Sequence, residues 1–364
     1  MEAGQQVIMG SDPVTHLMEQ GIKDQVFPGA VLLCARKQDI LYHQAFGVAD
    51  LQTQRPVTTN ALFDLASLTK PLATAIAMMV LVQQKQLDLD VCLKDLLPIT
   101  IGTPKAEITL DMLLRHTSGL PAHREYFRQT VSHPHPMQAM DRLVLSEPLI
   151  SLPGVNQVYS DLGYMVLSGV VREVTQTRLD RFVRDHVYQP LGIDDLFFID
   201  LTSSIAPEAQ SRLVSTRNCP WRGRVLKGEV EDENAWVSGG IQGHAGLFGT
   251  AAAVYRLCLE ILQAMERHSP RVLNPKVTAR FIQKYPGHSL VAGFDIPAGP
   301  GSAAGQYFSP RTVGHLGFTG TSFWIDPDNG RIVILLTNRV HPSRANQKIR
   351  KFRPEIHDCI VRHL

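Results

Sequence analysis

The sequence predicts an α+β (α/β) fold in which strands from both ends of the chain pair in one antiparallel sheet. β-Prone apolar runs at residues 30–36 and 40–48 flank Lys37-Gln38-Asp39, an arrangement typical of a hairpin. Three more strand-like runs lie between residues 313 and 337, and a Pro-Asp-Asn-Gly turn separates the last two. Helical patterns dominate the long stretch between these two groups of strands. We therefore expect a sheet lobe, a mostly helical second lobe, and a cleft between them.

The individual elements follow from local patterns along the chain. Asp12-Pro13 is a good helix start, and apolar residues follow it at helical spacing as far as Ile22. Residues 203–231 are poor in apolar side chains and are expected to form an extended excursion or a lid. The expected helices are 12–25, 71–82, 162–175, 180–186, 251–265 and 355–364, with short helical pieces in 87–97 and 108–114, and the expected strands are 30–36, 40–48, 313–318, 322–326 and 331–337.

We find no internal repeat and expect one domain over residues 1–364. Within it, the sheet lobe should take about residues 10–65 and 245–364, and the helical lobe about residues 66–244. A chain of this length can bury a large core, either as one big domain or as two lobes.

The composition, with 44% hydrophobic and 19% charged residues, is that of an ordinary soluble globular protein. Lys and Arg total 36 against 34 Asp and Glu, so we expect neither nucleic acid nor a membrane surface as a partner. The apolar run 71–82 is too short for a membrane span. The N-terminus lacks the pattern of a secretory signal, and the five cysteines are scattered without a Cys-x-x-Cys motif. These features favour a cytoplasmic protein with reduced, mostly buried thiols. Nothing in the sequence predicts the oligomeric state.

The stretch from Ala61 to Leu81 carries the first candidate for chemistry. Ser67 and Lys70 are three residues apart, and positions i and i+3 share one face of a helix. A serine needs a base beside it to act as a nucleophile, and a desolvated lysine can be that base. The apolar helix that follows would supply the desolvation. Since Ser-x-x-Lys also occurs by chance, the motif needs partners elsewhere in the chain.

Three other motifs have more ordinary explanations. His123, His133 and His135 lie in a loop without carboxylate or cysteine neighbours, so we interpret them as solvated and expect no metal. The glycine-dense stretch 239–250 indicates close backbone packing or a mobile pocket wall, and it matches no nucleotide-binding fingerprint. The segment Gly287-His288-Ser289-Leu290 resembles a lipase-type nucleophile elbow, but Val291 stands where that motif needs its last glycine.

Two further motifs complete a recognisable order. Tyr159-Ser160-Asp161 precedes an apolar helix, and His315-Leu316-Gly317 lies on an expected strand. Together with Ser67-x-x-Lys70, they resemble the three motifs of the penicillin-recognising serine hydrolases: class C β-lactamases, low-molecular-mass penicillin-binding proteins (DD-peptidases) and related esterases. The flanking stretches PGAVLL, LFDLASLTK, LLRHTSGLP, GHAGLFGTA, GHLGFTGTSFWIDP and LLTNRVHP are also similar to that family, from about Phe27 to Pro342. The resemblance implies a β-lactamase/DD-peptidase-like fold.

The resemblance also implies roles for the residues that match. Ser67 would attack an acyl carbonyl and form an acyl-enzyme, while Lys70 and Tyr159 would share the general base and acid duties. The backbone N–H groups of Ser67 and Phe318 would form the oxyanion hole. The family's reaction needs no metal and no organic cofactor.

Other residues would bind the substrate. His315 would border the pocket and bind a carboxylate or tune Tyr159, and Gly317 would let its strand lie against the acyl group. His244 either lines the pocket wall or is a structural histidine. Asp161 stands where the family usually has Asn, and it places a potential anion beside the catalytic groups.

The substrate is the least determined part of the prediction. Leu316 lacks the hydroxyl that a Thr would offer to a substrate carboxylate, and a hydrogen bond to a charged group is worth about 1.5–3 kcal/mol. We therefore expect a serine hydrolase of small carboxylic esters or amides. The alternatives are a β-lactamase or a DD-carboxypeptidase (muropeptide hydrolase), and a non-catalytic protein that binds cell-wall fragments.

Overall fold

The computed structural model describes residues 12–299 and 301–364, and its centre is an eight-stranded antiparallel sheet. The strands are β1 (Gly29–Arg36), β2 (Asp39–Asp50), β3 (Arg55–Pro56), β4 (Phe63–Asp64), β5 (Leu196–Phe198), β6 (Asn218–Cys219), β7 (Arg224–Val225), β8 (Leu247–Gly249), β9 (Leu290–Val291), β10 (Phe294–Asp295), β11 (Val313–Leu316), β12 (Ser322–Asp326) and β13 (Arg331–Thr337). The order in the large sheet is β3-β2-β1-β13-β12-β11-β10-β9. β1 pairs with β13 from Ala30 opposite Thr337 to Arg36 opposite Arg331, which confirms that the two ends of the chain share one sheet.

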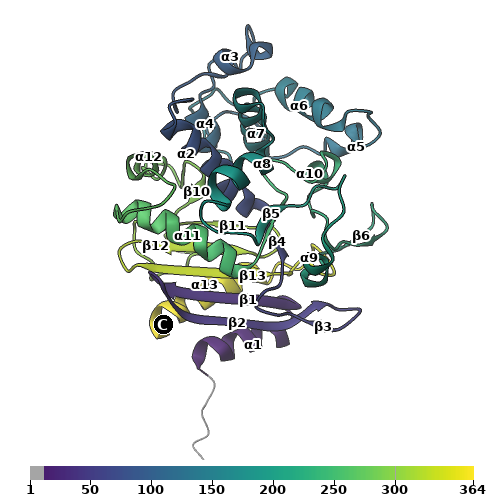
Figure 1. The fold of residues 1–364 in the computed structure, drawn as a ribbon, viewed down its shortest axis with the longest axis vertical. Coiled ribbons are helices and arrows are strands. Elements are labelled where there is room, and N and C mark those ends of the chain that lie inside the picture. The colour runs from purple at the N-terminus through teal and green to yellow at the C-terminus, as the bar shows by residue number, and fades with distance from the viewer. Residues whose placement is uncertain (1–11, 300) are drawn as a thin grey trace, which may run out of the picture.

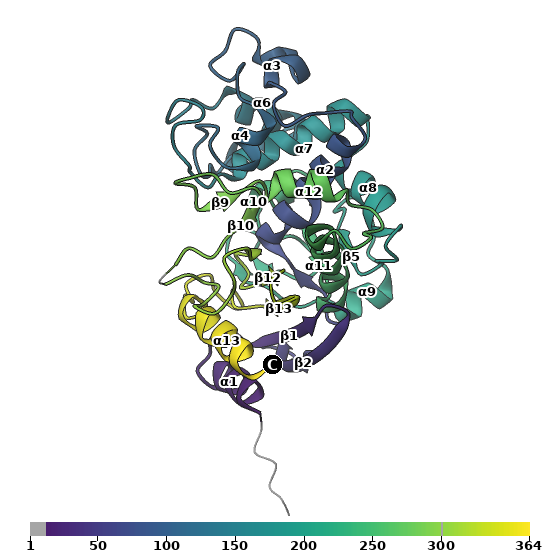
Figure 2. The same ribbon diagram turned by 90° about the vertical axis from the view of Figure 1, so that its left-hand side faces the viewer.

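Helices cover both faces of this sheet. The α-helices are α1 (Pro13–Lys23), α2 (Ile76–Gln83), α3 (Leu93–Leu96), α4 (Leu110–Leu114), α5 (Phe127–Thr130), α6 (Pro136–Ser146), α7 (Asp161–Thr175), α8 (Leu179–Val183), α9 (Pro207–Arg212), α10 (Glu233–Val237), α11 (Ala251–Glu266), α12 (Pro275–Phe281) and α13 (Ile349–His363). In Figure 2, α1 and α13 lie against one face and α11 lies against the other. Successive side chains along a strand point to opposite faces of the sheet: Leu32 packs with α1 and α13, whereas Val31 and Leu33 belong to the main core.

The helical middle of the chain lies at the far end of the molecule from α1, as Figure 1 shows. It connects to the sheet through a continuous helical segment formed by a 3₁₀ turn (Ala66–Leu68), a π-helix (Lys70–Ala75) and α2. This segment, Ala66–Gln83, has 18 residues and the apolar composition of a candidate membrane span, but 89% of it is buried inside the molecule. The apolar run is thus longer than the 71–82 stretch expected from sequence, and it packs as a core helix.

Several elements differ from the sequence prediction. α13 begins at Ile349 rather than at residue 355, with Pro354 inside it, and β11 ends at Leu316 rather than at residue 318. The two-residue strands β9 and β10, which extend the sheet, and the small sheet β4-β8-β5 were not predicted, because strands this short carry no periodic pattern. The excursion 203–231 contains only α9 and the short strands β6 and β7 as regular structure.

The glycine-rich stretch 239–250 packs closely against neighbouring backbone, which confirms the first of its two interpretations. A Cβ atom on Gly243 would lie 2.0 Å from the carbonyl oxygen of Tyr164, on α7. Gly246 adopts φ +113°, and a Cβ there would lie 2.2 Å from the carbonyl oxygen of Gly240. Only glycine satisfies both requirements, and this packing holds β8 beside the Ser67 segment.

Candidate active site

Ser67 lies in the 3₁₀ turn that begins the long buried helical segment. The preceding residue, Ala66, has φ +48°, a left-handed conformation that is uncommon outside glycine. Asp64 supports this turn, since its carboxylate accepts a hydrogen bond from the Ala66 N–H at 2.9 Å and another from the Glu231 N–H at 2.7 Å. Thr69 donates its hydroxyl to the Ala66 carbonyl at 2.6 Å. The turn that presents the serine is therefore fixed by buried side chains.

Lys70 is fully buried and directs its amine at Ser67. Its Nζ atom donates to Ser67 Oγ at 3.2 Å, to Asp161 Oδ1 at 2.7 Å and to the carbonyl oxygen of His244 at 3.4 Å. The side chain of Lys70 is 0% exposed and that of Asp161 is 19% exposed, so this ion pair is only weakly screened by water. The three acceptors match the three donors of a lysine ammonium group.

Charge interactions set the protonation state of this cluster. Burial disfavours the charged form of Lys70, but Asp161 and then Tyr159 outweigh it and hold the pKa of Lys70 above its ordinary value. Burial likewise opposes ionisation of Asp161, yet Lys70 and a hydrogen bond from His123 keep the pKa of that carboxyl well below its usual range. Burial raises the pKa of Tyr159, although the Lys70 charge opposes that rise. The resting cluster is therefore a lysine cation, an aspartate anion and a neutral phenol.

Tyr159 reaches this cluster from the loop before α7. The Nζ atom of Lys70 lies 4.8 Å from the centroid of its ring. The ring packs between His116 and His315, with centroid distances of 4.6 and 5.9 Å. Ser160 fixes the loop, because its N–H donates to His116 Nδ1 at 2.9 Å and its hydroxyl donates to the Pro121 carbonyl at 2.7 Å. The stretch RHTSGLP of the sequence thus forms the support for the tyrosine.

The end of β11 forms the opposite side of the site. Phe318 is 45% exposed, and its backbone N–H has no hydrogen-bond partner among residues 12–299 and 301–364. Its carbonyl accepts a hydrogen bond from Arg339 Nε at 2.9 Å, which fixes the peptide in place. A free backbone N–H on the rim of the cavity is what an oxyanion hole requires.

Gly317 is required by close packing. A Cβ atom on it would lie 1.9 Å from Thr321 Oγ1 and 2.7 Å from the Leu65 carbonyl oxygen. The glycine therefore allows β11 to approach the Ser67 segment closely, and its expected role beside the acyl group stays a prediction.

The positions of Leu316 and His315 correct two expectations. Leu316 packs against the cluster beneath α1 and α13, on the face of β11 opposite to His315, and it does not line the cavity. The missing hydroxyl at Leu316 therefore gives no geometric reason to exclude substrates that carry a carboxylate. His315 is 2% exposed and does not line the cavity either; its Nδ1 contacts the Leu316 carbonyl oxygen at 2.9 Å, so it supports Tyr159 from behind.

The cavity itself has a volume of about 300 Å³ and opens beside Ser67. Of the residues expected from sequence, Ser67, Tyr159, Asp161, His244 and Phe318 line it. The other lining residues were not predicted from sequence as part of the site: Asp64, Ala66, His123, Val230, Glu231, Asp232, Glu233, Ala245 and Arg344. Several of these belong to the end of the 203–231 excursion and to the start of α10.

His123 is the clearest correction among them. We interpreted it as a solvated loop residue without a carboxylate neighbour. Its side chain is 43% exposed, but its Nδ1 lies 3.1 Å from Asp161 Oδ2, and this hydrogen bond raises the pKa of His123. Its proximity to Asp161 depends on the fold and has no signal in the local sequence. Asp232, by contrast, could have been recognised as the N-cap of α10, since its carboxylate accepts from the Ala235 N–H at 2.8 Å.

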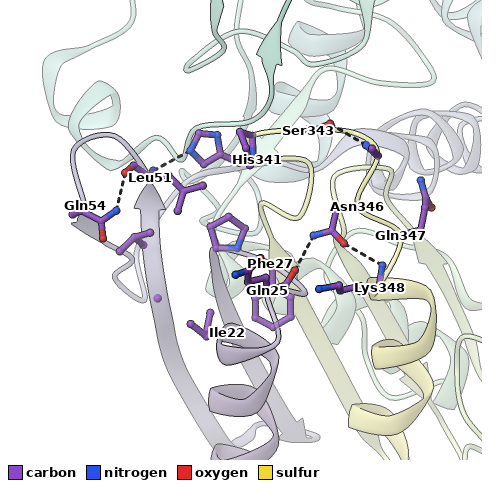
Figure 3. Close-up of a pocket in the computed structure, with 15 residues that line it drawn as sticks. Ile22, Gln25, Phe27, Leu51, Gln54, His341, Ser343, Asn346, Gln347 and Lys348 are labelled. Carbon is purple, nitrogen blue, oxygen red and sulfur yellow. Dashed lines mark hydrogen bonds between the residues drawn. The ribbon is translucent and has the colours of Figure 1, made fainter.

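A larger cavity, of about 910 Å³, lies elsewhere, between the end of α1, β2 and residues 341–348. Figure 3 shows its lining, in which Asn346 donates a hydrogen bond to the Gln25 carbonyl at 3.0 Å and His341 accepts one from the Leu51 N–H at 3.0 Å. The polar atoms named here pair with one another, and none of the three motifs contributes a lining residue. We therefore assign the chemistry to the smaller cavity.

The remaining motifs do not form competing sites. No group of three or more His, Cys, Asp or Glu side chains suited to a metal ion occurs in residues 12–299 and 301–364. The Ser289 hydroxyl donates a hydrogen bond to Gln157 Oε1. The residue lies in a turn before β9, with neither a strand directly before it nor a helix directly after it. It therefore lacks the structural context of a nucleophile elbow, as its sequence indicated.

Fold and site together define a serine hydrolase built around a Ser-x-x-Lys motif. Comparison with known proteins identifies the family: the model of the Beta-lactamase family matches residues 14–356, and the chain belongs to this family. A protein of Salmonella agona (strain SL483) is named "Putative D-alanyl-D-alanine carboxypeptidase". It is 29% identical to this chain over an alignment of 367 positions, which covers 92% of this chain and 84% of that protein.

Solved structures are similar in fold at lower identity. "EstCE1, a hydrolase with promiscuous acyltransferase activity" has a TM-score of 0.73 and 23% identity, covering 94% of this chain and 97% of its own. A penicillin-binding protein homologue from Pyrococcus abyssi, described as octameric, has a TM-score of 0.71 and 18% identity, covering 89% of this chain and 72% of its own. These structures support the β-lactamase/DD-peptidase-like fold predicted from sequence.

Proposed function

We propose that this protein hydrolyses small carboxylic esters or amides through an acyl-enzyme on Ser67. The observation that carries the proposal is the 3.2 Å contact between Ser67 Oγ and Lys70 Nζ at the wall of the cavity. Tyr159 lines the same cavity, and the Phe318 backbone N–H at its rim has no hydrogen-bond partner within the described part of the chain. A nucleophile, a proton acceptor and a donor for the oxyanion are the three parts that acyl transfer requires.

The charges of the site suggest how the proton moves. Because Asp161 keeps Lys70 cationic, we assign the base to Tyr159, whose phenolate the Lys70 cation would stabilise. The phenol of Tyr159 first loses its proton to solvent. Ser67 Oγ then adds to the acyl carbon as its proton passes to the Tyr159 phenolate, and the oxyanion binds the N–H groups of Ser67 and Phe318. The proton then passes from Tyr159 to the leaving group as the bond to the acyl carbon breaks. In deacylation, a water oxygen adds to the acyl carbon as its proton passes to the Tyr159 phenolate. Tyr159 then returns the proton to Ser67 Oγ as the acyl–Ser67 bond breaks, which releases the carboxylic acid.

The substrate class is part of the proposal. The cations at the cavity are already paired, Lys70 with Asp161 and Arg344 with Glu231 and Glu233, so a substrate carboxylate would have to compete for them. This favours neutral esters and amides over β-lactams and D-Ala-D-Ala peptides. The hydrolase EstCE1, which shares the fold, is consistent with this choice.

A DD-carboxypeptidase is the second candidate, and the name of the Salmonella relative favours it, since the similarity extends over 92% of this chain. A non-catalytic binding protein would not need the Ser67–Lys70 contact, so this contact favours an enzyme over a protein that only binds cell-wall fragments.

The experiment compares wild type, Ser67→Ala and Ser289→Ala on p-nitrophenyl butanoate, nitrocefin and a D-Ala-D-Ala peptide. We expect Ser67→Ala to abolish turnover and the mass shift of a trapped acyl-enzyme, and Ser289→Ala to retain both. Faster peptide than ester turnover would select the second candidate. Equal turnover by wild type and Ser67→Ala on every hydrolysed substrate would exclude an acyl-enzyme on Ser67.

A further inference from the structure

The turn after β11 carries the Phe318 N–H, and its backbone is held from two directions. Within the turn, the Gly317 N–H donates to the Thr321 carbonyl at 2.7 Å, and the Gly320 N–H donates to the Gly317 carbonyl at 3.1 Å. From α13, Arg353 Nη2 donates to the same two carbonyl oxygens, at 2.9 Å to Gly317 and at 2.7 Å to Thr321. These bonds fix the turn without using the Phe318 N–H.

Arg353 is a buried cation that faces no carboxylate. It is 6% exposed, and none of the ion pairs within residues 12–299 and 301–364 includes it. Burial, and after it the nearby charge of Arg339, lowers the pKa of Arg353 to about 9, so its guanidinium is still a cation at neutral pH. A buried charge without an ionic partner destabilises a fold, and its presence here calls for an explanation.

Arg353 acts on the peptide group that carries the Phe318 N–H. The carbonyl oxygen of Gly317 and the nitrogen of Phe318 belong to one planar trans peptide, so the C=O and the N–H point in opposite directions. A cation that donates to this oxygen draws electron density toward it, and the N–H on the other side becomes a stronger donor. Hydrogen bonds in such a chain strengthen one another.

We propose that Arg353 is a positioning residue for the oxyanion hole. Its charge fixes and polarises the peptide between Gly317 and Phe318, so that the Phe318 N–H stabilises the oxyanion that forms when Ser67 Oγ adds to the acyl carbon. This inference rests on the proposed function and adds to it a group behind the wall of the site. Arg353 does not line the cavity, so it acts through the peptide and not on the substrate.

The test compares two esters that differ in one atom: p-nitrophenyl butanoate and its thiono analogue, in which sulfur replaces the carbonyl oxygen. Sulfur is a weak hydrogen-bond acceptor, so the thiono ester gains little from an oxyanion hole. The ratio of the two kcat/KM values, oxygen ester over thiono ester, therefore measures the hole. Loss of folded enzyme or a displaced Ser67 lowers both values together and leaves the ratio unchanged.

We expect Arg353→Met, which removes the charge and both hydrogen bonds, to lower kcat/KM for the oxygen ester about tenfold or more and the ratio about fivefold or more. Removing an oxyanion donor altogether costs about 10² to 10³ in kcat, and a weakened donor should cost less. Arg353→Lys keeps the charge and should retain a larger ratio than Arg353→Met. If Arg353→Met does not fold, Arg353→Gln takes its place as the uncharged variant.

Arg331→Met is the matched control. Arg331 is 7% exposed, and it too is absent from the ion pairs of the part of the chain that the structure describes. It lies opposite Asp326, at the end of β12 that is remote from the Phe318 turn. Its loss removes a buried cation of the same kind and should leave the ratio unchanged.

Three outcomes would overturn the inference: an unchanged ratio in the uncharged variant, equal ratios in that variant and in Arg353→Lys, or a similar fall in Arg331→Met. Each of these leaves the proposed function intact, because wild type still hydrolyses the oxygen ester and Ser67→Ala does not. Failure of the proposed function would show instead as no Ser67-dependent turnover of either ester.

Discussion

Asp161→Asn tests whether the ion pair with Lys70 sets the pH at which the site works. The two charged atoms are 2.7 Å apart, and the side chains are 0% and 19% exposed. At an effective dielectric constant of 20, this separation corresponds to about 6 kcal/mol of attraction. That attraction favours the protonated lysine, so the site must reach a higher pH before it can release the proton that catalysis needs.

The direction of the expected change does not depend on which group releases that proton. Asp161 raises the pKa of Lys70 and also contributes to raising the pKa of Tyr159, and these two groups titrate as a coupled pair. Removing the anion lowers both values. The rising limb of the profile of kcat/KM against pH should therefore move to lower pH. One unit corresponds to about 1.4 kcal/mol, so less than a quarter of the attraction is enough to produce it.

The assay follows one p-nitrophenyl ester from pH 5 to 10, with the product detected at a wavelength where its absorbance does not depend on pH. We expect the limb to shift down by one unit or more in Asp161→Asn, and kcat/KM on the acidic side of the limb to rise about tenfold or more. Asp141→Asn removes a pair of similar length, 2.6 Å to Arg172, away from the cavity and should leave the limb in place. An unmoved or upward-moved limb would refute the reasoning and leave Asp161 with a structural role.

Two further predictions concern the base and the packing. Tyr159→Phe removes the phenol and leaves Lys70 in place, so we expect kcat to fall by about 10² to 10⁴ with unchanged folding by circular dichroism; a loss below tenfold would return the role of base to Lys70. Gly243→Ala should lower the free energy of unfolding by about 1–3 kcal/mol in urea titrations, since its Cβ would lie 2.0 Å from the Tyr164 carbonyl oxygen. Gly169→Ala, whose Cβ has no neighbour closer than 4.0 Å within α7, is the control and should be neutral or stabilising; equal losses in both variants would contradict the packing argument.

The part of the site that could be predicted consists of residues whose spacing carries information. Ser67 and Lys70 lie three residues apart on one helical segment, and their atoms are in contact. Tyr159 lies in a loop at a helix start, and the short polar loop before it supports the ring. The terminal strands were predictable from local pattern too, since β1, β2, β12 and β13 are runs of apolar, β-prone residues bounded by turns.

The rest depends on contacts between distant segments. His123 and Asp161 are 38 residues apart, and nothing near either residue indicates that they meet. Leu316 does not line the cavity, because neighbouring residues of a strand face opposite sides and its side chain packs with the cluster beneath α1 and α13. Asp232 was recognisable as a helix cap, but it lines the cavity only because the 230–233 segment returns to the Ser67 turn.

Asp64 shows how that return is achieved and why the site needs it. Its carboxylate accepts the Ala66 and Glu231 N–H groups, while its own carbonyl accepts the hydroxyl of Thr319 at 2.7 Å. One buried residue thus joins the serine turn, the acidic wall of the cavity, and the turn after β11 that carries Phe318. An oxyanion hole formed by Ser67 and Phe318 depends on a fixed separation between two N–H groups that lie 251 residues apart in the chain. Because Asp64 is tied to both turns, it connects the chain segments whose relative position the proposed chemistry requires.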